Sequence, residues 1–119
     1  MLESLSLDGK TIIITGGGTG LGKAIAIQVA EAGADVVLAS RRLAPLLDTA
    51  EVITKLGRKA LPISTDVSIS SDVEAMVSRS LDEFGKIDVL VNNAGKVTDN
   101  IKAPIWEITD EDWKTALDV

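Results

Sequence analysis

A glycine-rich turn near the start of the chain is the feature most able to support chemistry. An apolar run, Thr11–Thr15, leads into five glycines within seven residues, at positions 16, 17, 18, 20 and 22, and a helical pattern follows. Glycine lets backbone N–H groups come close to a phosphate, and the N-terminus of a helix favours an anion. The turn therefore predicts a phosphate-binding loop, belonging either to a nucleotide hydrolase or to a dinucleotide-binding domain.

The hydrolase alternative fails at one position. Gly17-x-x-x-x-Gly22-Lys23 has the spacing of a nucleotide-hydrolase loop, but Ala24 follows where that motif needs a Ser or Thr hydroxyl to bind Mg²⁺. The dinucleotide alternative is favoured, although Leu21 stands where the G-x-G-x-x-G pattern has its third glycine. A tight glycine turn without any ligand is the remaining interpretation.

Alternating strands and helices must position this loop. Apolar, β-branched runs predict strands at Thr11–Thr15, Asp35–Ala39, Lys59–Thr65 and Ile87–Val91. Helical patterns begin near Gly20, Pro45, Ser71 and Thr109, and glycines at 33, 57 and 85 end the first three. This alternation predicts an α/β fold, a Rossmann-type doubly wound parallel sheet with the strand order 3-2-1-4. Pro62 cannot donate to a strand ladder, so the third strand is expected at an edge.

Apolar spacing also predicts which helix residues are buried. The expected buried residues are Leu21, Ile25, Val29 and Ala32 in the first helix, Leu46, Ala50 and Ile53 in the second, and Val73, Val77, Leu81 and Phe84 in the third. Ser71 and Glu74 predict a capping box at the start of the third helix. Trp113 is expected to pack the fourth helix on the sheet, and Trp106 to anchor the loop before it.

Composition excludes several classes of function. The formal charge is −6, which disfavours nucleic acid as a partner, and the absence of His and Cys removes the usual zinc ligands. No run approaches the ~18 apolar residues that a membrane span needs. These features predict a cytoplasmic protein that binds neither a metal nor a membrane.

Three motifs at strand ends resemble those of the short-chain dehydrogenase/reductase family. They are Thr15-Gly16-x-x-x-Gly20-x-Gly22, Asp66-Val67, and Asn92-Asn93-Ala94-Gly95. They occur in the family's order over essentially the whole chain. The residues of the glycine loop and of Ala39–Arg42 also resemble, more weakly, those of enoyl-CoA, dienoyl-CoA and 3-oxoacyl reductases.

The resemblance implies a cofactor site. The pyrophosphate would lie on the glycine loop. Asp66 would accept a hydrogen bond from the adenine amino group, with the Val67 backbone beside it. Asn92 would line the adenosine, and Ala94 and Gly95 would pass near the nicotinamide ribose. The simpler alternatives are that Asp66 caps its own turn to Ser68 and that the asparagines are turn residues. The complete set of implied cofactor-binding residues is Thr15, Gly16, Gly18, Thr19, Gly20, Leu21, Gly22, Ser40, Arg41, Asp66, Val67, Asn92, Ala94 and Gly95.

The end of the second strand predicts which dinucleotide binds. NAD requires an acidic residue there for its ribose hydroxyl, but the chain has Ser40-Arg41-Arg42. Guanidinium groups suit the 2′-phosphate of NADP, so NADP is preferred and NAD is the alternative. Arg41 is expected to be the main contact with help from Ser40, whereas Arg42 is expected to face solvent. Thr19 stands where some family members carry another basic residue.

The family's proton donor is the tyrosine of a Tyr-x-x-x-Lys pair, and this chain has no tyrosine. We therefore expect residues 1–119 to form a dinucleotide-binding domain cut within its fourth helix and inactive alone. The whole protein would be a homo-oligomeric oxidoreductase that transfers hydride to or from a carbonyl, an alcohol or an activated enoyl substrate. The alternative is a non-catalytic dinucleotide-binding or subunit-pairing module.

Overall fold

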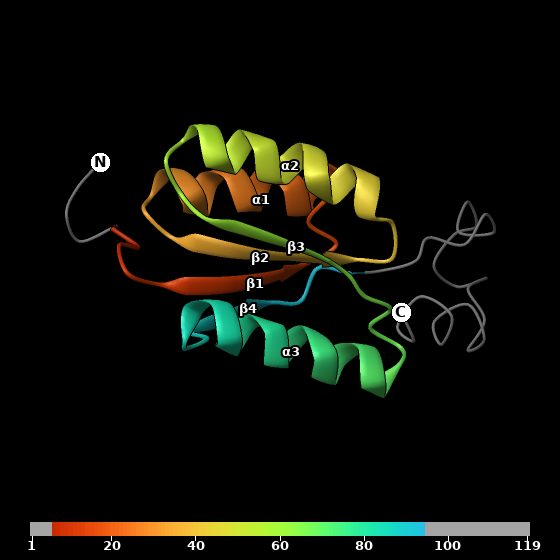
Figure 1. Cartoon of the computed structure of the whole chain (residues 1–119). Helices are drawn as coiled ribbons and strands as arrows, with labels where there is room; N and C mark the ends of the chain where they lie inside the picture. Colours follow the sequence, from red (N-terminus) through yellow and green to blue (C-terminus); the bar gives the residue numbers. More distant parts are fainter. Residues whose placement is uncertain (1–5, 95–119) are drawn as a thin grey trace, which may run out of the picture.

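A four-stranded parallel sheet forms the centre of the computed structural model, which describes residues 6–94 (Figure 1). Its strands are β1 (Thr11–Thr15), β2 (Asp35–Ser40), β3 (Ala60–Ser64) and β4 (Val89–Val91). The strand order is β3-β2-β1-β4, which confirms the predicted doubly wound arrangement. Within the described sheet β3 lies at one edge, where Pro62 is opposite Leu38 of β2.

Helices cover both faces of the sheet. The helices α1 (Gly20–Glu31) and α2 (Leu43–Lys55) lie on one face, and α3 (Ser70–Phe84) lies on the other (Figure 1). Within residues 6–94, no helix has both the length and the apolar character needed to cross a membrane. The fourth helix expected from Thr109, with Trp106 and Trp113, lies outside the described residues.

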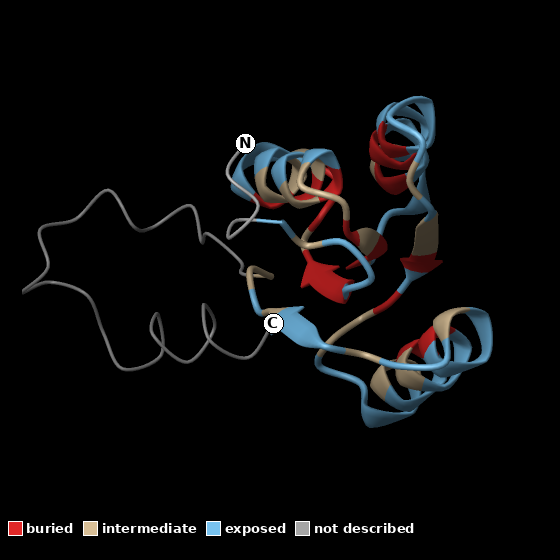
Figure 2. Ribbon diagram, turned by 90° about the vertical axis from the view of Figure 1, so that its left-hand side faces the viewer, coloured by how far each residue is buried: buried red, intermediate tan, exposed pale blue. Residues whose placement is uncertain are grey.

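The core follows from the twofold alternation of strand side chains. On one face of the sheet, Ile12 and Ile14 of β1 and Leu38 of β2 pack against α1 and α2. On the other face, Ile13 of β1 and Val37 of β2 pack against α3. All five residues of β1 are buried, as a strand covered on both faces requires. Figure 2 shows this buried layer between the helices.

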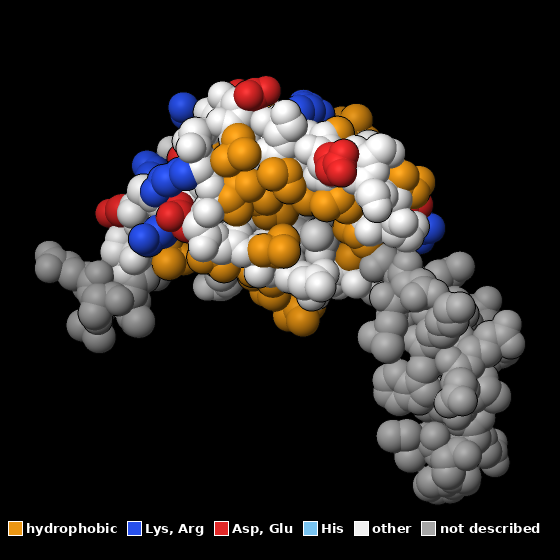
Figure 3. Space-filling view, turned by 90° about the horizontal axis from the view of Figure 1, so that it is seen from below, with side chains coloured by type: hydrophobic (Ala, Val, Ile, Leu, Met, Phe, Trp, Pro, Cys, Tyr) orange, Lys and Arg blue, Asp and Glu red, His pale blue; other side chains and the backbone are white. Residues whose placement is uncertain are grey.

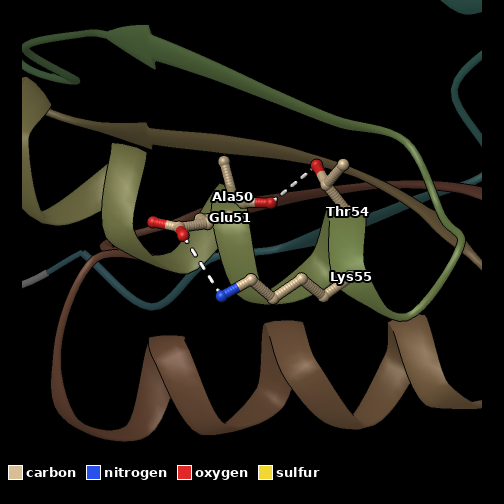
Figure 4. A network of polar contacts seen from close by, with 4 residues as sticks. All are labelled: Ala50, Glu51, Thr54 and Lys55. Atoms are coloured by element: carbon tan, nitrogen blue, oxygen red, sulfur yellow. Dashed lines mark hydrogen bonds and ion pairs between the residues drawn. The ribbon is translucent and has the colours of Figure 1, made fainter.

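The helix α2 has the predicted amphipathic pattern. Leu46, Ala50 and Ile53 are buried, as expected. On its outer side Glu51 and Lys55 form an exposed ion pair at 3.2 Å, and Thr54 Oγ1 donates to the Ala50 carbonyl at 2.9 Å (Figure 4). Such an exposed pair contributes only a few tenths of a kcal/mol, roughly 0.3–0.5, so burial rather than charge holds α2 in place.

The predicted buried face of α1 was wrong at its first residue. Gly22, Ala26 and Ala30 are the buried residues, whereas Leu21 is 68% exposed. The cause is that α1 approaches the sheet closely along a stripe of small residues. This close approach turns the larger side chains of Ile25 and Val29 to the sides, where they are partly buried.

The predicted start of α3 was also wrong. The N-cap is Ile69 and no side chain caps it, so Ser71 and Glu74 do not form a capping box. The Asp72 carboxylate, in the first turn, instead accepts the backbone N–H of Asp66 at 2.9 Å. Farther along α3, Met76 and Ser80 are buried, while Leu81 of the predicted face is exposed. The predicted residues Val73, Val77 and Phe84 do pack against the core, partly buried.

Apolar side chains gather on the α3 side of the molecule (Figure 3). Leu90 of β4 is opposite Ile13 in the register, and its side chain is 58% exposed. Leu81 of α3 is also exposed. The part of this face beside β4 is therefore less covered than the part over β2 and β3, where Val37 and Ile63 are buried.

A carboxylate connects β1 to the turn before β4 at the amino ends of the strands. Asp88 Oδ2 accepts the Thr11 backbone N–H at 2.8 Å and lies 3.1 Å from Lys86 Nζ. These contacts, with the Thr11 hydrogen bond the largest, lower the pKa of Asp88. Because the folded pKa is depressed, this stabilisation is present at neutral pH and is lost as the pH falls through the folded value.

We therefore expect Asp88→Asn to lower the free energy of unfolding at about pH 7, with the difference from the parent shrinking below about pH 4. Urea unfolding of both proteins across this range measures the difference. Asp82→Asn, an exposed position on α3, is the matched control and should have little effect. A difference of the same size at about pH 7 and about pH 3 would contradict the assignment.

Candidate cofactor site

A cavity of about 620 Å³ opens where the carboxyl ends of the strands meet. Parallel strands bring the residues that follow them to one edge of the sheet, and ligands of doubly wound folds bind there. The lining comes from the loops after all four strands, from the last residue of β2 and from the first turn of α2. It comprises Gly16, Gly18, Thr19, Ser40, Arg41, Arg42, Pro45, Thr65, Asp66, Val67, Asn93 and Ala94.

The glycine loop leaves β1 through a left-handed residue. Gly16 has φ +70°, a conformation that side chains rarely adopt, and its N–H donates to the Ala39 carbonyl at 2.7 Å. This bond ties the start of the loop to the end of β2. The chain then passes through Gly18 and Thr19 along the cavity before α1 begins.

Gly22 is the point of closest packing between α1 and the strand ends. A Cβ built at this position would overlap the Gly16 carbonyl group, 2.7 Å from its carbon, and would lie 2.6 Å from Asn93 Nδ2. Backbone atoms surround the position, so it has no room for a methyl group unless the loop moves. Glycine here therefore fixes the position of the loop.

Thr15 connects the loop to the segment after β4. Its buried Oγ1 accepts the backbone N–H groups of Asn93 at 2.9 Å and Ala94 at 3.0 Å. Asn93 Nδ2 makes a longer contact, 3.5 Å, with the Gly16 carbonyl. The hydroxyl therefore holds two parts of the cavity wall that are far apart in sequence.

Thr15→Val keeps the shape of the side chain but removes both acceptor contacts. We expect it to lower the free energy of unfolding by about 1–2 kcal/mol, because two partly buried N–H groups lose their partner. Thr15→Ser keeps the hydroxyl and should retain most of the stability. Chemical unfolding measures both variants, and a larger loss for Ser than for Val would show that the methyl group, not the hydroxyl, matters.

The N-terminus of α1 provides an electropositive wall. Its N-cap, Thr19, makes no side-chain capping bond, and the first turn contains no acidic residue. The first N–H groups of a helix lack intrahelical acceptors, and the helix dipole adds partial positive charge at this end. This end of α1 is suited to an anion such as a pyrophosphate.

Two arginines follow β2 directly and line the cavity. Arg41 and Arg42 are both exposed and both line the cavity, so Arg42 faces solvent as predicted but also borders the site. The Arg41 backbone is fixed by Ser64 Oγ, which donates to its carbonyl at 2.9 Å. Ser40 Oγ donates to the Arg42 carbonyl at 3.1 Å, so its hydroxyl must rotate before it can donate to a ligand.

Asp66 contributes the negative charge of the cavity wall. Its Oδ1 accepts the backbone N–H of Ser68 at 3.0 Å and the Ser68 hydroxyl at 2.6 Å. These bonds lower the pKa of Asp66, with a further contribution from the charge of Arg41, and keep the carboxylate ionised. The expected alternative of a turn cap to Ser68 is therefore present, and Asp66 also lines the cavity.

The structure brings most of the predicted residues to one cavity. Those that line it are Gly16, Gly18, Thr19, Ser40, Arg41, Asp66, Val67 and Ala94. The remaining described residues, which do not line it, are Thr15, Gly20, Leu21, Gly22 and Asn92. Gly95 lies outside the described residues.

Sequence reasoning missed four lining residues, Arg42, Pro45, Thr65 and Asn93. Thr65 and Asn93 are next to predicted residues, so strand-end position could have identified them. Pro45 lines the cavity because α2 packs against the glycine loop. A Cβ built at Gly18 would lie 2.8 Å from Pro45 Cβ. No sequence signal carries that contact.

Comparison with known proteins decides the family. A family model described as short chain dehydrogenase matches residues 10–119. The chain belongs to the short-chain dehydrogenase family. The resemblance found in the three strand-end motifs is thereby confirmed, and the cavity at the strand ends is the place where that family's motifs meet.

Curated relatives in this family are identical to the chain at more than a third of the aligned positions. It is 34% identical over 119 residues to 2-dehydro-3-deoxy-D-gluconate 5-dehydrogenase of Escherichia coli (strain K12), covering 100% of this chain and 45% of the relative. It is 39% identical over 113 residues to 3beta-hydroxysteroid dehydrogenase 2 of Eggerthella lenta, covering 95% and 43%. The chain thus spans less than half the length of these relatives.

A solved structure shows the same fold. The short-chain type dehydrogenase/reductase from Mycobacterium marinum is 40% identical and superposes with a TM-score of 0.75 over 87% of this chain and 43% of that one. Short-chain dehydrogenases of this kind share the Rossmann-type sheet described above.

Proposed function

We propose that the chain is the dinucleotide-binding part of a short-chain oxidoreductase and prefers NADP to NAD. The observation that carries the preference is the pair of guanidinium groups, Arg41 and Arg42, that lines the cavity directly after β2. NAD-binding domains of this fold need a carboxylate at that point for the ribose hydroxyl. The chain has Asp35 at the opposite end of β2, where it accepts the Lys59 N–H at 3.0 Å.

The residues of the cavity fit such a cofactor. The first turn of α1, with Gly16–Gly22, would bind the pyrophosphate, and Arg41 with Ser40 would bind the 2′-phosphate. Asp66 would accept a hydrogen bond from the adenine amino group, with Val67 beside it. Asn92 would line the adenosine, and Ala94 and Gly95 would lie near the nicotinamide ribose. The bound nicotinamide would supply or accept a hydride.

The proposal extends to the whole protein. Its substrate would be a small molecule with a carbonyl, an alcohol or an activated double bond, and it would act in the cytoplasm as a homo-oligomer. Residues 1–119 contain no tyrosine to donate the proton, so this chain alone should bind the cofactor without turnover. The slighter likeness to enoyl-CoA, dienoyl-CoA and 3-oxoacyl reductases stays a prediction.

Backbone NMR of the isotope-labelled chain tests where the cofactor binds. Adding NADP should shift the amide signals of the glycine loop, of Arg41 and of Asp66 and Val67. Mg²⁺-ATP at the same concentration is the control for a nucleotide hydrolase and should shift them much less. Shifts confined to residues away from the cavity, or equal shifts with both ligands, would contradict the proposal.

A further inference from the structure

Asp66 is held by four hydrogen bonds within the turn between β3 and α3. Its Oδ1 accepts the Ser68 hydroxyl at 2.6 Å and the Ser68 N–H at 3.0 Å. Its own N–H donates to Asp72 Oδ2 at 2.9 Å, and its carbonyl accepts the Ile69 N–H at 3.0 Å. Both the backbone and the side chain of Asp66 are therefore fixed before any ligand arrives.

These bonds leave one carboxylate oxygen available. Both side-chain bonds reach Oδ1, and within residues 6–94 no hydrogen bond reaches Oδ2. Asp66 lines the cavity, whereas Ser68 is exposed and does not line it. Ser68 would therefore affect a bound ligand through Asp66 or through the turn, and not by direct contact.

We infer that Ser68 is a positioning residue for recognition of the adenine ring. It holds Asp66 Oδ1 so that Oδ2 faces the exocyclic amino group, and Asp72 fixes the backbone from which the carboxylate extends. The inference rests on the proposed function, because Asp66 must be the group that accepts the adenine amino group. A bond as short as 2.6 Å between a hydroxyl and a carboxylate is charge-assisted and among the stronger hydrogen bonds in proteins.

A side chain that is already oriented loses less freedom when a ligand binds. Without the Ser68 hydroxyl, Asp66 would have to be ordered by the ligand itself. Removing the hydroxyl should therefore weaken the binding of ligands that donate a hydrogen bond to Asp66, and it should leave the binding of other ligands unchanged. A ligand without the amino group therefore separates positioning of Asp66 from a general effect on the turn.

The test compares two dinucleotides on three proteins. NADPH and its 6-oxo analogue, which has hypoxanthine in place of adenine, are titrated into the parent chain, Ser68→Ala and Ser68→Thr. Ser68→Ala should weaken NADPH binding about three- to tenfold and change binding of the 6-oxo analogue by less than about twofold. Ser68→Thr keeps the hydroxyl and should stay within about twofold of the parent for both ligands.

Each other result has a definite meaning. An equal loss for both dinucleotides, or a Ser68→Ala chain that no longer folds by circular dichroism, would overturn the inference because Ser68 would then support only the turn. An unchanged NADPH affinity would overturn it as well. If the parent binds neither dinucleotide, the proposed function fails, and the inference fails with it. The parent titration therefore distinguishes the two failures.

Discussion

Gly22→Ala is expected to weaken dinucleotide binding about a hundredfold and to lower the free energy of unfolding by about 1–3 kcal/mol. The added methyl group would crowd Asn93 Nδ2 and would overlap the Gly16 carbonyl, a backbone group that cannot move without shifting the loop. Several N–H groups that would bind the pyrophosphate then lose their alignment together, at about 1 kcal/mol or more for each hydrogen bond. Calorimetric titration with NADPH and urea unfolding measure the two effects.

Helix propensity alone predicts the opposite sign for this substitution. Alanine is about 1 kcal/mol better than glycine within a helix, so a more stable Gly22→Ala protein would contradict the packing at this position. Gly20→Ala is the comparison for stability alone, because it adds the same methyl group where nothing lies within 4 Å. Its left-handed φ of +56° should cost about 1–2 kcal/mol in stability without the clash.

Arg41→Ala is expected to weaken NADPH binding about ten- to a hundredfold while changing NADH binding less than about threefold. The reason is that a guanidinium group bound to the 2′-phosphate makes charge-assisted hydrogen bonds that NADH cannot receive. Titrations of both dinucleotides into the parent and the variant give the affinity ratio directly. An unchanged ratio would show that Arg41 does not read the 2′-phosphate.

Two further variants make the Arg41 result specific. Arg41→Lys keeps the charge but loses the paired donors, so its loss should be intermediate. Arg42→Ala removes a neighbouring charge from the same cavity and should cost less than Arg41→Ala. If Arg42→Ala has the larger effect, the roles of the two arginines are reversed.

The sequence predicts the sheet well because its strands are unambiguous. Thr11–Thr15 is apolar without alternation, which indicates burial on both faces, and the structure gives this strand the predicted bounds. Pro62 predicts the edge position of β3 because proline lacks an N–H donor. Both inferences depend on local chemistry that no tertiary contact can change.

Helix faces and caps are harder to predict because tertiary packing decides them. The pattern in α1 favours Leu21 and Ile25, but the distance between helix and sheet selects Gly22, Ala26 and Ala30 instead. At α3 the Ser71–Glu74 spacing fits a capping box, yet the helix begins one residue earlier and Asp72 bonds back to Asp66. A one-residue shift in register is enough to defeat such a pattern.

The candidate site is predictable to the extent that strand ends define it. Ser40 ends β2, Arg41 and Asp66 come after strands, and all three meet at one edge, as parallel topology requires. The Asp66–Ser68 cap was an expected alternative, but the Pro45 contact and the bond from Asp66 to Asp72 could not be predicted, because they depend on how α2 and α3 approach the loops. Family resemblance supplied the roles of the residues, and the structure supplied their neighbours.

The most direct test of the central claim is the affinity of the 119-residue chain for NADPH relative to NADH, measured by equilibrium titration. We expect saturable binding of one dinucleotide per chain, with NADPH at least about tenfold tighter, because Arg41 and Arg42 line the cavity where the 2′-phosphate would lie. Equal or tighter binding of NADH would contradict the proposed preference. A chain that binds neither dinucleotide would contradict the proposed function itself.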